Sequence, residues 1–85
     1  MLRARFARAL AVKLREARLA SGFSIVGLAA RIDVSKVTVA AWELERKLPR
    51  ADRLVRVADA LGVSVAWLIG ESRRGGPRPR RRRRT

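Results

Sequence analysis

The sequence predicts a small all-α domain with a disordered basic C-terminal tail. Two observations predict the helices: apolar residues recur at helical spacing between residues 3 and 69, and no stretch alternates apolar and polar residues as a strand does. The third observation is a change of composition at residue 72. From there the chain reads SRRGGPRPRRRRRT, with no apolar and no acidic residue, which predicts disorder. We therefore divide the chain into a domain at 1–71 and a tail at 72–85.

Three serines mark helix starts, because each is preceded by an apolar residue and followed four positions later by another. The serine hydroxyl caps a free amide of the first turn, and the apolar pair packs as a staple that sets the entry angle. These serines are Ser24, Ser35 and Ser64. A fourth start, at Arg50, has the apolar pair but no good capping side chain. With a first amphipathic stretch, the predicted helices lie at 3–20, 25–32, 36–44, 51–61 and 65–69.

The three longest apolar faces supply the candidate core. They consist of Phe6, Leu10, Leu14 and Ala17; of Ile25, Leu28, Ala29 and Ile32; and of Leu54, Val57, Ala58 and Leu61. Each set follows the spacing of one helix face. Trp42 follows Val39 by three positions and is expected in the core. Trp67, on the short last helix, is expected either at the edge of the core or in an interface.

The link between the helices at 25–32 and 36–44 is the most informative spacing. Only Asp33, Val34 and Ser35 separate them, and so short a link makes two helices cross steeply as a helix-turn-helix. Such a turn needs a residue in the left-handed backbone conformation. Aspartate is among the few side chains that accept this conformation, so we expect Asp33 to adopt it.

Composition excludes several classes of function. The chain has 21 Lys and Arg against 7 Asp and Glu, a net charge of +14, and no His or Cys. Disulfides, ordinary zinc or haem sites and the usual catalytic base are therefore missing, and we expect no metal, no cofactor and no enzyme activity. No apolar stretch is long enough to span a bilayer, so no membrane partner is expected. The basic N-terminus continues in helical register into Glu16, which favours a structural helix over a targeting segment.

Five segments of the chain resemble a known family. They are LREARLASGFS at 14–24, LAARIDVS at 28–35, WE at 42–43, LP at 48–49 and ADALGVSVAWLIG at 58–70. In order and spacing they are similar to the helix-turn-helix domain shared by phage lambda-type repressors, Cro proteins and the xenobiotic-response-element regulators. The resemblance covers residues 10–70. It implies a five-helix lambda-repressor-like fold in which the helix at 36–44 lies in the major groove of double-stranded DNA.

The resemblance also implies roles for individual residues. Arg18 and Glu43 match a structural salt bridge between the first and third helices of relatives. Base contacts are implied for Lys36, Val37, Ala40 and Ala41, and phosphate or groove-edge contacts for Ser35, Thr38, Arg46 and Lys47. Lys36 can donate to guanine O6 and N7, and Val37 can pack on a thymine methyl group. Relatives act as dimers on DNA, so a homodimer is expected.

The chain departs from this family on its presumed DNA face. Where relatives carry Gln and acidic or polar residues at the start of the second helix, this chain has Ile25, Val26 and Gly27. Ala40 and Ala41 also replace polar residues. An apolar face makes few hydrogen bonds to bases, so it supports an alternative: a protein–protein interaction module with only unspecific nucleic-acid affinity. An architectural protein that coats DNA is a third possibility.

The tail carries eight arginines without a single acid. They are Arg73, Arg74, Arg78, Arg80, Arg81, Arg82, Arg83 and Arg84. We expect an arm that contacts phosphates or enters a minor groove, and the alternative is a solvated tail that aids solubility. Taken together, the composition and the resemblance imply a small sequence-specific transcriptional regulator of the repressor or Cro type. We expect it to be cytoplasmic and nucleoid-associated, and bacterial or phage-encoded.

Overall fold

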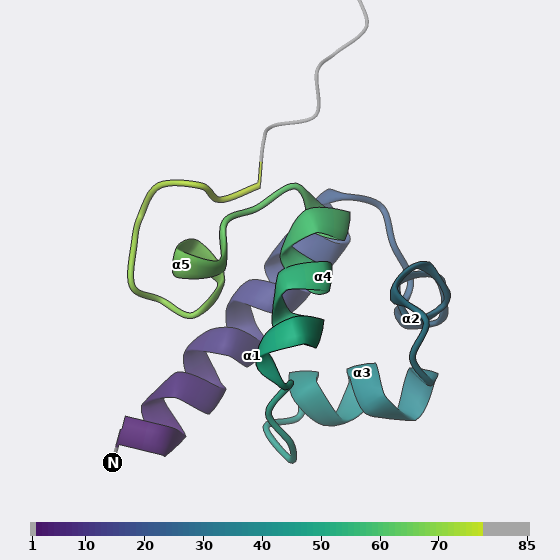
Figure 1. Cartoon of the computed structure of the whole chain (residues 1–85), viewed down its shortest axis with the longest axis horizontal. Coiled ribbons are helices and arrows are strands. Elements are labelled where there is room, and N and C mark those ends of the chain that lie inside the picture. The colour runs from purple at the N-terminus through teal and green to yellow at the C-terminus, as the bar shows by residue number, and fades with distance from the viewer. Residues whose placement is uncertain (1, 78–85) are drawn as a thin grey trace, which may run out of the picture.

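The computed structural model describes residues 2–77, and this part of the chain contains five helices and no strand. In chain order they are α1 (Leu2–Ala20), α2 (Ile25–Ile32), α3 (Lys36–Glu43), α4 (Ala51–Leu61) and α5 (Val65–Leu68), as Figure 1 shows. The predicted all-α, five-helix architecture is confirmed. The expected bounds of α2 and α4 agree with those observed, and those of α1, α3 and α5 differ by one residue at one end.

The predicted serine caps are all present. Ser24 accepts a hydrogen bond from the Gly27 amide, and Ser35 and Ser64 cap α3 and α5 in the same way. Arg50 stands at the start of α4 in extended conformation and makes no capping side-chain bond, as expected. Three of the four later helices therefore begin at a capped residue, because the sequence places a hydroxyl where the first-turn amides are free.

All five helices end in the same way. A residue one or two positions after the helix end adopts a left-handed conformation, and the residue that follows it donates its N–H to a carbonyl five positions back, as from Val34 to Ala29 at 3.0 Å. The left-handed residues are Gly22, Asp33, Glu45, Gly62 and Gly70. Asp33, at φ 60° and ψ 50°, has the conformation expected of it. Of these five residues, Asp33 before α3 and Glu45 after it are the two that are not glycine.

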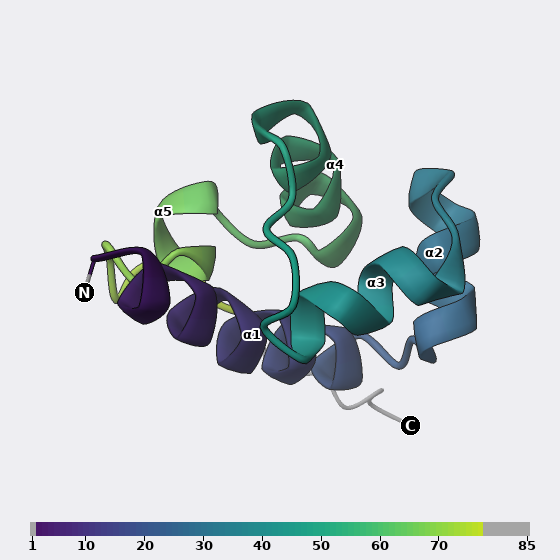
Figure 2. The ribbon, with the colours of Figure 1, turned by 90° about the horizontal axis from the view of Figure 1, so that it is seen from below.

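The core is assembled from one side of each helix. α1 packs against α3 and α5, α2 packs against α3 and α4, and α4 also contacts α5. Figure 2 shows α3, α4 and α5 lying on one side of α1. Both tryptophans are buried, and Trp67 therefore belongs to the core of this chain. The core residues are Leu10, Leu14, Ala17, Leu28, Ala29, Ile32, Val39, Trp42, Leu54, Val57, Ala58, Leu61, Val63, Trp67 and Leu68.

The chain after α5 turns back onto that helix, in a stretch that we call the return segment (residues 71–77). The Ser64 amide donates to the Gly75 carbonyl at 2.8 Å, and the Ser64 hydroxyl donates to the Arg74 carbonyl at 3.3 Å. Glycine is required at Gly76, since a Cβ there would lie 2.7 Å from the Trp67 indole nitrogen. We expected disorder from residue 72 onward, whereas residues 72–77 follow a course set by these hydrogen bonds. Residues 78–85 lie outside the described part, so disorder there stays a prediction.

Trp67 also connects the return segment to α1. The Lys13 ammonium lies over the Trp67 ring, 4.7 Å from its centroid, which is a cation–π arrangement. The Gly76 backbone approaches the indole nitrogen closely. One aromatic side chain thus joins the first helix, the last helix and the segment from which the basic tail continues.

Candidate nucleic-acid interface

The inner side of α3, which faces the core, is built from Val39, Trp42 and Glu43. Val39 and Trp42 are buried in the core. Glu43 forms a two-pronged ion pair with Arg18 of α1: Nε to Oε2 is 2.6 Å and Nη2 to Oε1 is 3.0 Å. The two side chains are only 8% and 5% exposed, so the pair is nearly excluded from water.

The guanidinium of Arg18 joins three segments of the chain. Besides Glu43, it donates from Nη1 to the Phe23 carbonyl at 2.9 Å, in the loop that leads into α2. The hydrogen bond to Glu43 raises the pKa of Arg18, while burial acts in the opposite direction. The residues matching the family's salt bridge therefore lie together, and they hold the inner side of α3 in one orientation relative to α1.

The turn between α2 and α3 is supported from a direction that sequence reasoning missed. Arg56 of α4 donates from Nη1 to the Ile32 carbonyl at 3.2 Å, at the C-terminal end of α2. A cation at a helix C-terminus is favourable, because the last carbonyls carry partial negative charge. No local pattern announces this contact, since Arg56 follows Ile32 by 24 residues and lies on another helix.

The outer side of α3 is open to solvent. Lys36 and Val37 are exposed, and the Val37 side chain is 70% accessible. Ala40 and Ala41, one turn further on, are half-buried. Every residue for which the resemblance implies a base contact therefore lies at least partly accessible on α3. Lys36 is the member of this set that can donate hydrogen bonds to a base edge.

The two hydroxyls at the start of α3 are engaged with each other. Ser35 Oγ accepts the Thr38 amide at 3.1 Å and lies 2.9 Å from the Thr38 hydroxyl. Both residues serve the cap of α3, and they also stand at the N-terminus of that helix. The free amides and the helix dipole make this end of a helix favourable for a phosphate group.

The loop after α3 carries two exposed cations. Glu45 adopts the left-handed conformation at φ 62°, and the amide of Arg46 donates to the Ala41 carbonyl at 2.9 Å. Lys47 follows at once, and both Arg46 and Lys47 are exposed. Sequence reasoning missed Glu45, because glycine is the usual signal for this conformation. The helix end places two positive charges beside the C-terminus of α3.

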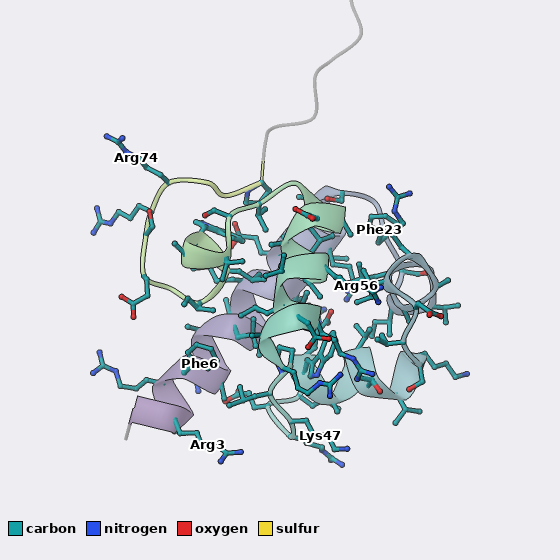
Figure 3. All side chains as sticks on the ribbon, in the orientation of Figure 1. Arg3, Phe6, Phe23, Lys47, Arg56 and Arg74 are labelled. Carbon is teal, nitrogen blue, oxygen red and sulfur yellow. The ribbon has the colours of Figure 1, made fainter. Side chains whose placement is uncertain are left out.

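The basic residues of the tail are not brought to this surface. Arg73 and Arg74 are exposed in the return segment, beside α5. Figure 3 shows Arg74 at the opposite end of the molecule from Lys47. The structure therefore separates the described part of the predicted arm from α3. The other arginines of the arm lie outside the described residues: Arg78, Arg80, Arg81, Arg82, Arg83 and Arg84.

The apolar departures from the family pattern have different outcomes. Ile25 is half-buried and packs against the core, so it extends the inner face of α2. Val26 and Val37 are 60% and 70% exposed, on the two helices of the helix-turn-helix.

Within residues 2–77, no three Asp or Glu side chains gather as a metal site would require. No helix in this range has the length and hydropathy needed to cross a bilayer.

A family model described as helix-turn-helix matches residues 14–68, from the last two turns of α1 to the end of α5. The chain belongs to this helix-turn-helix family. The resemblance that the sequence motifs indicate is thereby confirmed. No match was found among curated proteins.

Solved structures share the fold of this helix-turn-helix protein. A hypothetical transcription factor, NHTF from Neisseria, is 28% identical with a TM-score of 0.72, covering 75% of this chain and 74% of that one. The clp gene regulator ClgR from Corynebacterium glutamicum is 34% identical with a TM-score of 0.71, covering 84% and 71%. A third structure, Apo-HppE, is 29% identical with a TM-score of 0.68, but this chain covers only 35% of it. The family match and the first two structures support a DNA-binding role in transcription regulation.

Proposed function

We propose that this helix-turn-helix protein is a sequence-specific transcriptional regulator of the repressor or Cro type, which acts by occupying an operator. The observation that carries the proposal is the contrast between the two sides of α3. The inner side is locked to α1 through the Arg18–Glu43 pair, while the outer side presents Lys36 and Val37 to solvent. A helix held rigidly on one side and bare on the other is suited to enter a major groove.

Base readout in this proposal is confined to the N-terminal part of α3. Lys36 donates to guanine O6 and N7, and Val37 packs against a thymine methyl group. Ala40 and Ala41 follow the groove without hydrogen bonds. Readout of this kind discriminates at few positions, with each good contact contributing about 1 to 3 kcal/mol.

Phosphate contacts supply most of the affinity. The DNA backbone is contacted on either side of the groove. These contacts come from Ser35 and Thr38 at the N-terminus of α3, and from Arg46 and Lys47 after its end. Each cation that neutralises a phosphate steepens the salt dependence of binding by about one unit of slope. The tail arginines add an unspecific contribution through their charge.

The regulator acts as a homodimer on double-stranded DNA, as a cytoplasmic, nucleoid-associated protein that is bacterial or phage-encoded. Two copies place their α3 helices in successive major grooves, which sets the half-sites about 34 Å apart. Repression then follows from steric exclusion of other proteins at the operator. The family membership supports this arrangement.

A second candidate function has a specific observation in its favour. Val26 and Val37 expose apolar surface on adjacent helices. The side chain of Val26 can neither bind a phosphate nor form a hydrogen bond with a base edge. In this alternative, the α2–α3 face binds a partner protein, and DNA affinity is unspecific. The two functions predict different consequences of placing a carboxylate on α3.

Selection of bound sequences from random duplex DNA at about 150 mM salt tests the proposal. We expect the full chain to enrich a palindromic motif, and the Val37→Glu variant to enrich none, because a carboxylate in the groove repels phosphates. Val55→Glu is the matched control, since Val55 is an exposed valine on a different helix, α4, and is 51% accessible. Failure of the full chain to enrich any motif, with salt-sensitive binding retained in Val37→Glu, would favour the interaction module.

A further inference from the structure

α1 has an outer side that lies opposite its core contacts. Leu10, Leu14 and Ala17 fill the core from the inner side, where Figure 2 places α3, α4 and α5. On the outer side, five exposed residues recur at alternating spacings of three and four. They are Arg5, Arg8, Val12, Arg15 and Leu19, and we call them the α1 outer stripe. This spacing is that of a helix–helix seam.

The stripe combines apolar and cationic surface. Val12 and Leu19 are 57% and 56% exposed, two turns apart, and the three arginines flank them. An open depression beside the N-terminal half of the stripe is lined by Arg5, Arg8, Ala9, Val12 and Lys13. One acidic residue lies beside the stripe: Glu16 is exposed, one position after Arg15 and four positions after Val12, so the three arginines outnumber it.

Two of the three cations of the stripe, Arg5 and Arg8, are unfavourable for α1 in isolation. The first turn of α1 has no acidic residue, and Arg5 and Arg8 stand near the helix N-terminus, which already carries partial positive charge. Cations at this end of a helix repel the dipole and each other, so bound carboxylates would relieve the repulsion. Binding of an anionic partner to the stripe is therefore electrostatically favourable.

We propose that the α1 outer stripe docks an acidic amphipathic helix of a partner protein. Apolar side chains of the partner pack on Val12 and Leu19, and its Asp and Glu side chains pair with the three arginines. Guanidinium groups suit this role, because each can bind a carboxylate with two parallel hydrogen bonds. The surface lies apart from Lys36 and Val37, so the inference goes beyond the proposed DNA binding.

Charge complementarity selects this occupant over others. A second copy of the chain would bring two sets of three arginines into one seam, and like charges placed together cost affinity. Nucleic acid would pair with the arginines but would leave Val12 and Leu19 without apolar contact. A helix with both acidic and apolar residues satisfies both parts of the stripe.

A defined peptide tests the proposal on the full chain. The probe is a capped helix of about 20 residues, long enough to be helical alone, with leucine along one stripe and glutamate on both flanks. Its control is a peptide of the same composition in scrambled order. Amide NMR spectra of the protein locate the contacts, and calorimetry gives the affinities. We expect shifts concentrated on the α1 outer stripe and weaker binding of the scrambled peptide.

Matched variants separate specific docking from general attraction by a basic protein. Arg8→Glu with Arg15→Glu should weaken binding about tenfold or more, since two ion pairs become repulsions. Arg31→Glu with Arg53→Glu changes the net charge equally, outside the stripe, and should have little effect. Val12→Ser should weaken binding, whereas Val55→Ser should not. Circular dichroism confirms that each variant is folded.

Three results would overturn the proposal. Equal binding of the ordered and scrambled peptides would mean that net charge alone causes the attraction. Shifts centred on α3 instead of α1 would assign the peptide to the other surface. A dimer of the full chain in sedimentation, abolished by Val12→Ser, would assign the stripe to a second copy.

Discussion

The two sides of α3 differ in nearly every physical respect. The inner side buries Val39 and Trp42 and pairs Glu43 with Arg18 in a two-pronged contact. The outer side exposes Lys36 and Val37 to solvent. Eight residues of one helix therefore contain both a rigid anchor and a free surface.

This difference teaches that folding and recognition are separable within one short helix. Substitutions on the inner side should change the free energy of unfolding, while those on the outer side should change binding at constant stability. Helix periodicity makes the separation possible, because positions three or four apart share a side. Each of the following predictions tests one side against the other.

The largest effect is expected from Arg18→Ala on the inner side. The substitution leaves the Glu43 carboxylate nearly buried and unpaired, so we expect a loss of about 3 kcal/mol in the free energy of unfolding. Urea denaturation followed by circular dichroism measures it. The control is Arg50→Ala, which removes the exposed 3.5 Å pair with Asp52 and should change stability by less than about 0.5 kcal/mol.

A double replacement sharpens this first prediction. Arg18→Met with Glu43→Leu removes both charges and keeps apolar volume, so it should be far less destabilising than Arg18→Ala alone. If the double variant is as unstable as the single one, the unpaired carboxylate is not the cause. The packing of the Arg18 stem would then be the larger contribution.

The next effect concerns the outer side. Lys36→Ala should lower discrimination at one base pair of the selected motif by about 2 kcal/mol, while the unfolding free energy stays unchanged. Binding to motif and mutated duplexes measures it. Lys47→Ala is the comparison, because loss of a phosphate contact weakens all duplexes equally and lowers the salt slope by about one. Equal weakening by both variants would refute a base contact from Lys36.

A smaller effect is expected at the start of α3, where the two sides meet. Ser35→Ala removes the acceptor for the Thr38 amide and should cost about 1 kcal/mol of stability. Thermal unfolding reports the change. Ser21→Ala is the control, since Ser21 is exposed and its hydroxyl forms no hydrogen bond within residues 2–77. An unchanged melting temperature in Ser35→Ala would mean that water replaces the cap at no cost.

The smallest effect is a gain. Glu45→Gly relieves the left-handed strain after α3, and after the entropy of the added glycine we expect about 0.5 kcal/mol of stabilisation. Glu45→Ala keeps the strain and should not stabilise. Urea midpoints of the two variants distinguish backbone relief from loss of the carboxylate, because both variants remove the charge equally.

Local signals explain why most of the fold was predictable. Ser24, Ser35 and Ser64 stand at helix starts because a hydroxyl and its flanking apolar pair act within one turn of the chain. The bounds of α2 and α4 follow from the same cues, closed by Asp33 and Gly62. The position of α3 in a helix-turn-helix follows from a three-residue link. These features need no information from distant parts of the sequence.

Features that depend on distant contacts were not predictable. Arg56 of α4 donates to the carbonyl of Ile32 at the end of α2, and Lys13 of α1 lies over Trp67 of α5. The glycines of the return segment look like a flexible linker in sequence, yet Gly76 is needed for a close approach to the Trp67 indole nitrogen. The Arg18–Glu43 pair, 25 residues apart, was expected only through resemblance to a family.

The positions of the two tryptophans make the intrinsic fluorescence of the protein a probe of two separate regions. The chain has two Trp and no Tyr, so its ultraviolet fluorescence comes from two indoles that report different regions. Trp42 lies on the inner side of α3, and Trp67 lies between Lys13 and the return segment. A chain with only Trp42 would signal detachment of α3 from α1, and one with only Trp67 would signal release of the return segment. Each event can thus be followed in real time, without an attached label.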